Sequence, residues 1–266
     1  MIASSAVATA ASARRSRRRR NREPRSCAGP GGHGALGVRG SAMAKLGKIL
    51  QTLDRRSLPV HVTPAARAWL EGMAVALPRP QALLLRSLLE PRLAEVTLRA
   101  ARNEQLRLIE RALRNTVTAT IVHGGNKINV IPAEVELELD GRTLPGFGPD
   151  DLIREVHDLV GPDLELELIR HDHSPAEPDL TWFDGLGAII RELDPTGVPV
   201  PMLQVGVTDG RFFSRLGIQT YGFLPLELPP DFEFVKLIHA ADERVPADAL
   251  RFGAEAVGRA VERYAG

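Results

Sequence analysis

The clearest alternation of hydrophobic and polar positions lies in the middle of the chain. Val135, Leu137 and Leu139 are separated by acidic residues, so one face of a strand is expected to be buried and the other wet. β-branched residues mark an earlier strand, and a polar turn separates the two. The elements expected here are strands over 116–122 and 130–139, an amphipathic helix over 148–161 and an alternating strand over 163–171.

Helical periodicity dominates the region before these strands. Apolar residues recur at helical spacing over residues 41–53. A long, mostly helical insertion is predicted over 58–115, where Thr63 is a plausible N-cap and Pro64 suits the first helical position. Its leucine stripes indicate packing, and its sequence leaves open whether it buries a dimer contact or covers a pocket.

The C-terminal pattern predicts a helix over 180–193, a buried strand over 198–205 and a closing helix over 247–264. Four polar or small residues follow the buried strand: Gly206, Thr208, Asp209 and Gly210. Ligands bind at that edge of open α/β sheets, so a binding turn is expected there.

His239 stands in a polar loop before the closing helix, beside Asp242 and Glu243. Its place suits a metal ligand. By itself it is more simply a surface or capping histidine. The triplet 171–173 (HDH) could bind metal, but it is more simply a strand end, and His61 is given no role.

Charge is distributed unevenly over the 266 residues. Residues 1–28 contain eight arginines and one glutamate, whereas residues 29–266 carry a net charge of −6. This mildly acidic body gives no reason to expect nucleic acid as a partner. Cys27 is the single cysteine, so no internal disulfide forms, and no apolar run approaches the ~20 residues of a membrane span.

The segment 1–28 is low in complexity, and its dense like charges predict a disordered tail. Two functional alternatives are a basic arm for nuclear localisation or nucleic acid, and an organelle transit peptide. A secretory signal fits poorly because the apolar stretch precedes the arginines.

Three polar residues of the central region each have a simple local interpretation. His33 lies in the glycine-rich stretch 29–40, where its ring is free to face a cleft, although the stretch could equally be a linker. Asn129 lies in a turn, where an asparagine commonly satisfies local backbone groups. Arg142 lies at the end of a hairpin, where an arginine is ordinarily exposed.

Taken together, the stretches GGHG, GGNKINVIP, DGRTLPG and TDGRF, with His239 before the last helix, resemble the zinc metallopeptidases of peptidase family M-twenty. That family includes aminoacylases, glutamate carboxypeptidases, acetylornithine deacetylase and succinyl-diaminopimelate desuccinylase. The resemblance implies an α/β fold. Residues 29–173 correspond to a sandwich-like lid (dimerisation) domain with the insertion 58–115, and residues 174–266 to the C-terminal part of the catalytic domain.

The resemblance also implies roles. His33 and Asn129 would stabilise the oxyanion of a tetrahedral intermediate, and Arg142 would hold the substrate carboxylate. Gly206, Thr208, Asp209 and Arg211 would line the substrate pocket. His239 would bind one of two zinc ions. The family motif usually has a proline where Gly37 stands here.

Other expected motifs are missing from this sequence. There is no adjacent Glu-Glu pair, and no His-x-Asp motif followed by the expected strand and helix. His239 alone cannot hold zinc, which needs about three protein ligands at a catalytic site. The chain is therefore expected to be an incomplete copy of an amide-cleaving zinc hydrolase, inactive by itself.

The resemblance further implies a cytoplasmic homodimer formed through the lid, with a small N-acyl amino acid or peptide as substrate and no membrane partner. Two alternatives stay open. One is a non-catalytic dimerisation or binding module, and the other is a nucleic-acid binder that uses the arginine-rich arm.

Overall fold

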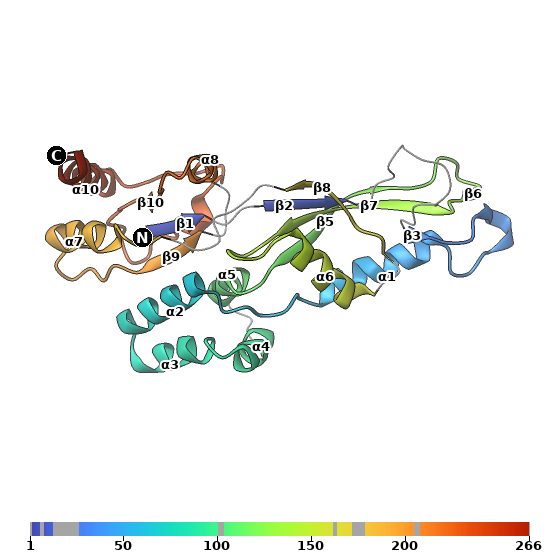
Figure 1. Ribbon diagram of the computed structural model, residues 1–266, viewed down its shortest axis with the longest axis horizontal. Coiled ribbons are helices and arrows are strands. Elements are labelled where there is room, and N and C mark those ends of the chain that lie inside the picture. The colour runs from blue at the N-terminus through green and yellow to red at the C-terminus, as the bar shows by residue number, and fades with distance from the viewer. Residues whose placement is uncertain are drawn as a thin grey trace.

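The computed structural model describes residues 2–5, 8–12, 27–100, 104–161, 164–171, 179–204 and 208–265 of the chain. The protein is an elongated α/β molecule (Figure 1). A β-sheet with two helices forms one end, and a helical cluster and a second small sheet form the other. The α/β class expected from the sequence is confirmed.

The larger sheet belongs to the predicted lid. Its strands are β2 (Ala8–Ser12), β3 (Cys27–Ala28), β5 (Thr116–His123), β7 (Glu134–Arg142) and β8 (Glu167–His171). β7 is central: β5 pairs with one of its edges, β2 and β3 pair with the other, and β8 lies beyond β2. All these pairs are antiparallel. Among the described strands, β3, β5 and β8 each pair with one neighbour only, and β5 and β8 are the long outer strands.

Two helices, α1 (Ala42–Arg55) and α6 (Pro149–Val160), cover one face of this sheet (Figure 1). Val135, Leu137 and Leu139 of β7 are all buried, and they pack with leucines of both helices. The predicted alternation is confirmed. Each helix begins at a polar cap: the Ser41 hydroxyl accepts the Ala44 N–H, and the Gly148 N–H donates to Asp151.

The second predicted strand is divided. Residues Val130–Ile131 form β6, which pairs with β4 (Gly32–His33) in a separate two-stranded ribbon. The main-sheet strand resumes at Glu134. Pro132 lies between the two pieces and has no N–H to donate to a ladder, which explains the break.

The insertion folds as four helices: α2 (Pro64–Ala76), α3 (Arg79–Ser87), α4 (Pro91–Ala100) and α5 (Glu104–Ala112). The Thr63 hydroxyl caps α2, and Pro64 takes its first position, as predicted. The insertion has its own hydrophobic core, which extends to Leu203 of the C-terminal region. A Cβ on Gly72 would meet Val200 at 2.8 Å, so glycine permits this close approach.

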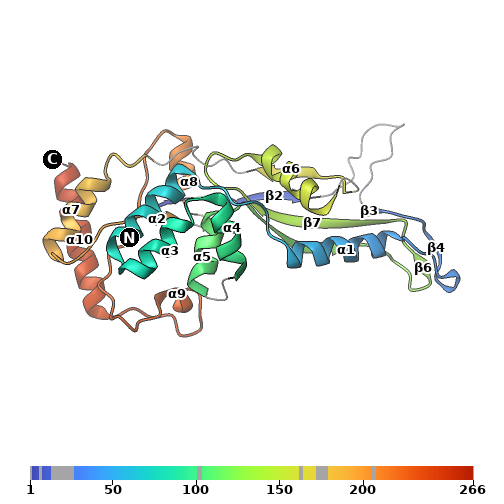
Figure 2. The ribbon, with the colours of Figure 1, turned by 90° about the horizontal axis from the view of Figure 1, so that it is seen from below.

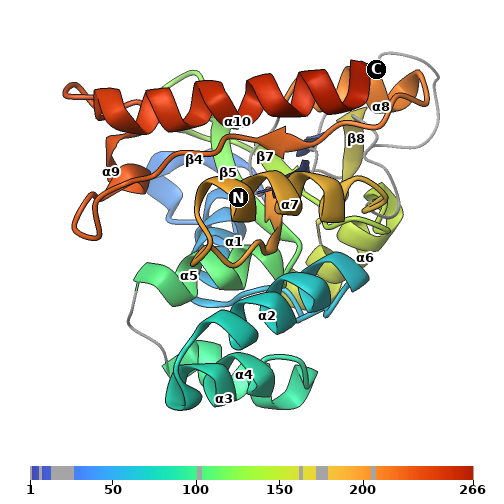
Figure 3. The same ribbon diagram turned by 90° about the vertical axis from the view of Figure 1, so that its left-hand side faces the viewer.

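The C-terminal region joins a small sheet to helices. Its elements are β9 (Pro201–Gln204), β10 (Gly222–Phe223), α7 (Phe183–Leu193), α8 (Gly210–Arg215), α9 (Phe234–Leu237) and α10 (Ala247–Ala265). α10 lies along α7, and they share a small core around Ile189 and Ala256 (Figure 3). No helix in the described ranges is both long and apolar enough to cross a bilayer.

The N-terminal segment departs from the predicted disorder. β1 (Ile2–Ser5) pairs in parallel with β9 and antiparallel with β10, and β2 enters the lid sheet between β7 and β8. Both strands precede the first arginine, so the repulsion of like charges does not act on them. β1 and β2 supply backbone hydrogen-bond partners to β8, β9 and β10, which pair with no other described strand. The arginine cluster itself lies outside the described residues.

Candidate functional site

His33 and Asn129 meet at the far end of the lid, which we call the lid tip. His33 pairs with Val130 in the β4–β6 ribbon, and the Gly34 N–H donates to the Asn129 carbonyl oxygen at 2.8 Å. Both residues are exposed. The ribbon therefore brings the backbones of two residues that are far apart in sequence close together, which agrees with the shared role that the family resemblance implied.

The hydrogen bond of the His33 ring fixes which nitrogen carries the proton. Nδ1 accepts the Ala35 N–H at 3.2 Å and so caps the short 3₁₀ helix Gly34–Leu36. An accepting Nδ1 carries no proton, so in the neutral ring Nε2–H is a donor. Among the described residues, neither Nε2 of His33 nor the side-chain amide of Asn129 has a hydrogen-bond partner. Both donors are thus available to a ligand.

Gly37 explains why this chain lacks the proline of the family motif. It ends the short helix at φ 58°, and its N–H points to the Gly34 carbonyl oxygen at 3.5 Å. Proline is fixed near φ −65° and has no N–H, so it could not adopt this turn. The departure is a local change of turn that leaves His33 in place.

Arg142 does not lie at the lid tip. It ends β7, whose nine residues span roughly 27 Å, and the ribbon of the tip lies beyond the opposite end. Its guanidinium donates to Asp140 Oδ2 through Nη2 at 2.9 Å and Nε at 3.2 Å. The side chain is 43% exposed, so the group keeps access to solvent. Arg142 and the tip cannot hold the same small molecule within one chain.

The predicted binding turn, Thr208–Arg211, leads into α8. The Phe212 N–H donates to the Asp209 carbonyl oxygen at 2.9 Å, and the Arg211 N–H to that of Thr208 at 3.3 Å. Thr208 and Asp209 are exposed. The Arg211 guanidinium lies 4.6 Å from the centre of the Phe212 ring. Gly206 lies outside the described residues.

His239 is exposed in the loop after α9, and its backbone adopts φ 60°. The neighbouring Asp242 carboxylate is paired with Arg244. Within the described ranges, no three His, Cys, Asp or Glu side chains gather so that they could hold a metal. The residues that the structure describes therefore do not fit a zinc site, and His173 of the HDH triplet lies outside them.

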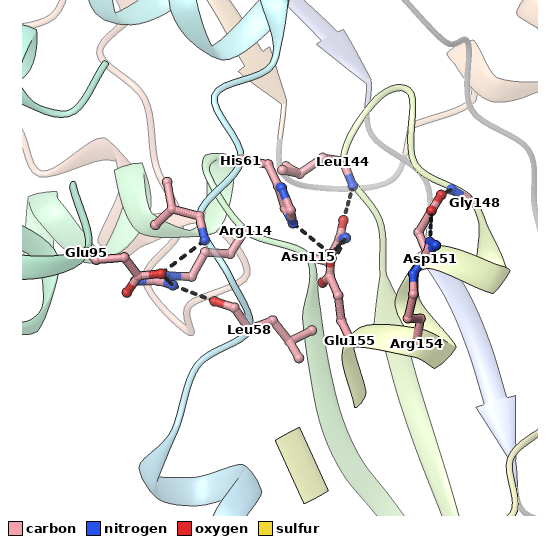
Figure 4. Close-up of polar contacts among 11 residues, drawn as sticks. Leu58, His61, Glu95, Arg114, Asn115, Leu144, Gly148, Asp151, Arg154 and Glu155 are labelled. Carbon is pink, nitrogen blue, oxygen red and sulfur yellow. Dashed lines mark hydrogen bonds and ion pairs between the residues drawn. The ribbon is translucent and has the colours of Figure 1, made fainter. Parts of the chain in front are cut away.

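Sequence reasoning missed a buried polar group where the insertion meets the lid (Figure 4). His61 Nε2 lies 2.7 Å from Glu155 Oε1, and the Asn115 amide donates to both Glu155 oxygens at 3.2 and 3.1 Å. The Leu144 N–H donates to Asn115 Oδ1 at 2.8 Å. The His61 ring packs on Phe147 with 4.4 Å between ring centres. His61 thus has a structural role.

Arg114 and Glu95 extend this group, and with His61, Asn115 and Glu155 they form what we call the junction cluster. Arg114 donates to the two Glu95 oxygens at 2.8 and 3.0 Å, and also to the Leu58 carbonyl oxygen. Its side chain is 3% exposed. These bonds from Arg114 are the main reason that the pKa of Glu95 is below its usual value. No sequence pattern marks these long-range pairs.

Comparisons with known proteins agree on one family. The family model described as "Peptidase dimerisation domain" matches residues 25–166, just over half of the chain. A relative from Dictyostelium discoideum, "Probable carboxypeptidase S-like 2", is 31% identical over 139 residues, which are 50% of this chain and 26% of that protein. An N-fatty-acyl-amino acid synthase/hydrolase from Homo sapiens is 25% identical over 143 residues, 52% of this chain and 28% of that protein.

This chain therefore spans about a quarter of the length of these curated relatives. Among solved structures, an aminopeptidase PepT from Bacillus cereus superposes with a TM-score of 0.47 at 13% identity, over 99% of this chain and 55% of that one.

Proposed function

Because the chain belongs to the peptidase dimerisation domain family of peptidase family M-twenty, we propose that it forms the lid-bearing part of a metal-dependent hydrolase. The bond cleaved is the amide of an N-acyl amino acid or small peptide with a free carboxylate. The observation that carries this proposal is the lid tip. There the backbone brings His33 close to Asn129, and each side chain keeps a donor that has no partner among the described residues.

Two donors at the tip suit the central step of amide hydrolysis. Attack on the carbonyl places negative charge on its oxygen, and preorganised donors stabilise that charge. The His33 Nε2–H and the Asn129 amide can both donate without giving up a bond to a described residue. Arg142 suits the substrate carboxylate, because a guanidinium binds it at two points.

A hydrolase of this kind also needs a metal and a general base. The described residues do not assemble a zinc site, so no step is derived through zinc. We propose that this chain binds and orients the substrate, and that turnover needs ligands which it does not assemble. Purified protein should hold well under one zinc per chain and hydrolyse no N-acyl amino acid. Two tightly bound zinc ions with turnover would contradict this.

A second copy of the chain completes the proposed site. The tip lies at one end of the molecule. The helices α8 and α9, next to the binding turn and His239, lie in the other half (Figure 2). One small substrate cannot reach both within one chain. We propose that the tip of one copy meets the Thr208–Arg211 turn of the other.

The outer strand β5 suits the interface of this homodimer. It pairs with β7 on one side, and no other described strand pairs with it. Ile121 and Val122 near its tip end are 45% and 47% exposed. A free strand edge with exposed apolar residues is a template for pairing with a second chain.

Substrate binding tests the proposed function. N-dodecanoyl-phenylalanine is a suitable probe, because one relative is named for N-fatty-acyl amino acids. His33→Ala and Asn129→Ala should each weaken binding by about tenfold in calorimetry, as for loss of one hydrogen bond in a desolvated site.

The matched control is His123→Ala, which removes another exposed histidine, at the end of β5. The control should bind as the unaltered chain does. If the unaltered chain does not bind the probe, or binds it equally well after both tip substitutions, the proposed function is wrong.

A further inference from the structure

The insertion is the basic part of a mildly acidic body. Residues 58–115 contain nine arginines and five glutamates, a net charge of +4, whereas residues 29–266 as a whole carry −6. α3 and α4 form the outer edge of the insertion, away from α10 (Figures 1 and 3). They are joined by three residues whose N–H groups all bond back into α3. Any surface that approaches this edge meets these two helices first.

The two helices carry the same short motif of exposed residues. In α3 the order is Arg79, Leu83, Arg86, and in α4 it is Arg92, Val96, Arg99. The spacing is four and then three residues in both helices, which places each trio in one stripe along the helix. We call these six residues the arginine–apolar surface. Each stripe holds one apolar side chain between two cations.

All six side chains lie outside the core. Leu83 and Val96 are 65% and 68% exposed, although each helix buries other apolar residues, such as Leu85 and Leu98. The core therefore does not need Leu83 or Val96 for packing. Single exposed apolar side chains are common on protein surfaces, so the feature that needs an explanation is their regular placement between cations.

The arginines of this surface keep their charge available. Among the described residues, no carboxylate pairs with Arg79, Arg86 or Arg92. Arg99 lies 3.7 Å from Glu95, but that carboxylate is already held by Arg114. The surface thus combines uncompensated positive charge with exposed hydrocarbon.

We propose that the arginine–apolar surface docks on an anionic lipid surface. Guanidinium groups bind lipid phosphates and carboxylates, while Leu83 and Val96 enter the boundary between headgroups and acyl chains. Nucleic acid would match the arginines but would leave both apolar side chains in water. A bilayer satisfies both parts of the motif, and the charges are complementary.

This inference goes beyond the proposed function and does not depend on it. It departs from the sequence-based expectation of no membrane partner, because that expectation considered only spanning segments. A docked chain would meet amphiphilic molecules at the lipid layer. Docking is measured on vesicles without any substrate, so its failure and that of substrate binding are separate results.

The test is co-sedimentation with vesicles of phosphatidylserine and phosphatidylcholine, beside vesicles of phosphatidylcholine alone. Because the eight arginines between residues 14 and 25 would bind the same anionic vesicles, every protein carries them as glutamine. One variant combines R79Q, R86Q and R92Q, and a second combines L83Q and V96Q. The control combines R55Q, R191Q and R251Q, three exposed arginines outside the insertion, and so makes the same change of charge.

The parent chain should bind the anionic vesicles and not the neutral ones. The three arginine substitutions should weaken binding by about 100-fold, since each arginine contributes about fivefold near an anionic surface. The double apolar variant should also bind less, and its remaining binding should disappear at high salt. The control should lose much less than the arginine variant.

Several results would overturn the proposal. They are no binding by the parent chain, equal losses in the control and in the arginine variant, or unchanged binding after L83Q and V96Q. Capture of an acidic protein or of nucleic acid through the same arginines, without vesicle binding, would assign the surface to that partner instead.

Discussion

Two regions of this molecule hold polar side chains in opposite ways. In the junction cluster, Asn115 is 1% exposed and Glu155 is 9% exposed, and their polar atoms are paired with one another, with His61 and with backbone. At the lid tip, His33 and Asn129 are exposed, and their donors have no partner among the described residues.

The contrast between the junction cluster and the lid tip distinguishes a structural role from a proposed role in ligand binding. Buried polar groups are costly to leave unpaired, so the many hydrogen bonds of this buried cluster indicate a structural role. An exposed donor can bond to water in the free protein, so leaving it without a protein partner costs no stability. It can exchange that water for a ligand. Both regions contain a histidine, but the His61 ring is bonded to a buried carboxylate, whereas His33 is exposed. The residue type alone would not have distinguished them.

Replacement of Asn115 should have the largest effect on the free energy of unfolding. Asn115→Ala leaves the buried Leu144 N–H without an acceptor and part of the buried Glu155 carboxylate without a donor. The free energy of unfolding should fall by about 3 kcal/mol, measured by urea denaturation. Asn129→Ala at the tip is the control and should leave it unchanged. Equal losses would remove the contrast between the two regions.

A fall in pH should reduce the stability that the junction cluster contributes, because Glu95 becomes protonated. Its pKa is lowered in the folded state, chiefly by hydrogen bonds from Arg114, so the stabilisation is present above the ordinary value of about 4.3. It is lost as the pH falls through the lower folded-state pKa. Glu95→Gln should cost about 1–2 kcal/mol at neutral pH, and this difference should shrink in acid. A difference that grows in acid would refute the assignment.

A charge on the free edge of the lid should weaken the dimer. Ile121→Lys places two like charges at the proposed β5 interface, so dissociation should become at least about tenfold easier in sedimentation experiments. Leu168→Lys, on the opposite outer strand β8, is the matched control. Loss of the dimer only in the control would move the interface to β8.

The smallest effect on stability is expected at the tip. His33→Ala removes one hydrogen bond, from the Ala35 N–H, at a solvent-exposed turn. The free energy of unfolding should change by less than about 0.5 kcal/mol, although substrate binding falls. A loss comparable with that of Asn115→Ala would show that His33 is structural.

Local patterns were sufficient to predict several elements of the fold. Alternation identified β7 and its buried residues, β-branched residues identified β5, helical periodicity identified α6, and a cap identified the start of α2. Each of these features depends on neighbours within a few residues, so it can be predicted from the local sequence.

Features that depend on distant partners were not predictable. β1 and β2 form because strands far along the chain offer free edges, whereas their own sequence is low in complexity. The junction cluster joins His61 to Glu155, two residues with no sequence motif between them. The separation of Arg142 from the tip follows from the length and direction of β7.

The central claim is that the tip of one copy and the binding turn of another share one substrate. The most direct measurement mixes two variants, His33→Ala and the double variant T208A/D209A, and titrates the mixture with N-dodecanoyl-phenylalanine. Each variant alone should bind weakly. Because each mixed dimer regains one unaltered site, about a quarter of the wild-type sites should return. If mixing restores no binding although mixed dimers form, the tip and the turn do not meet across the dimer.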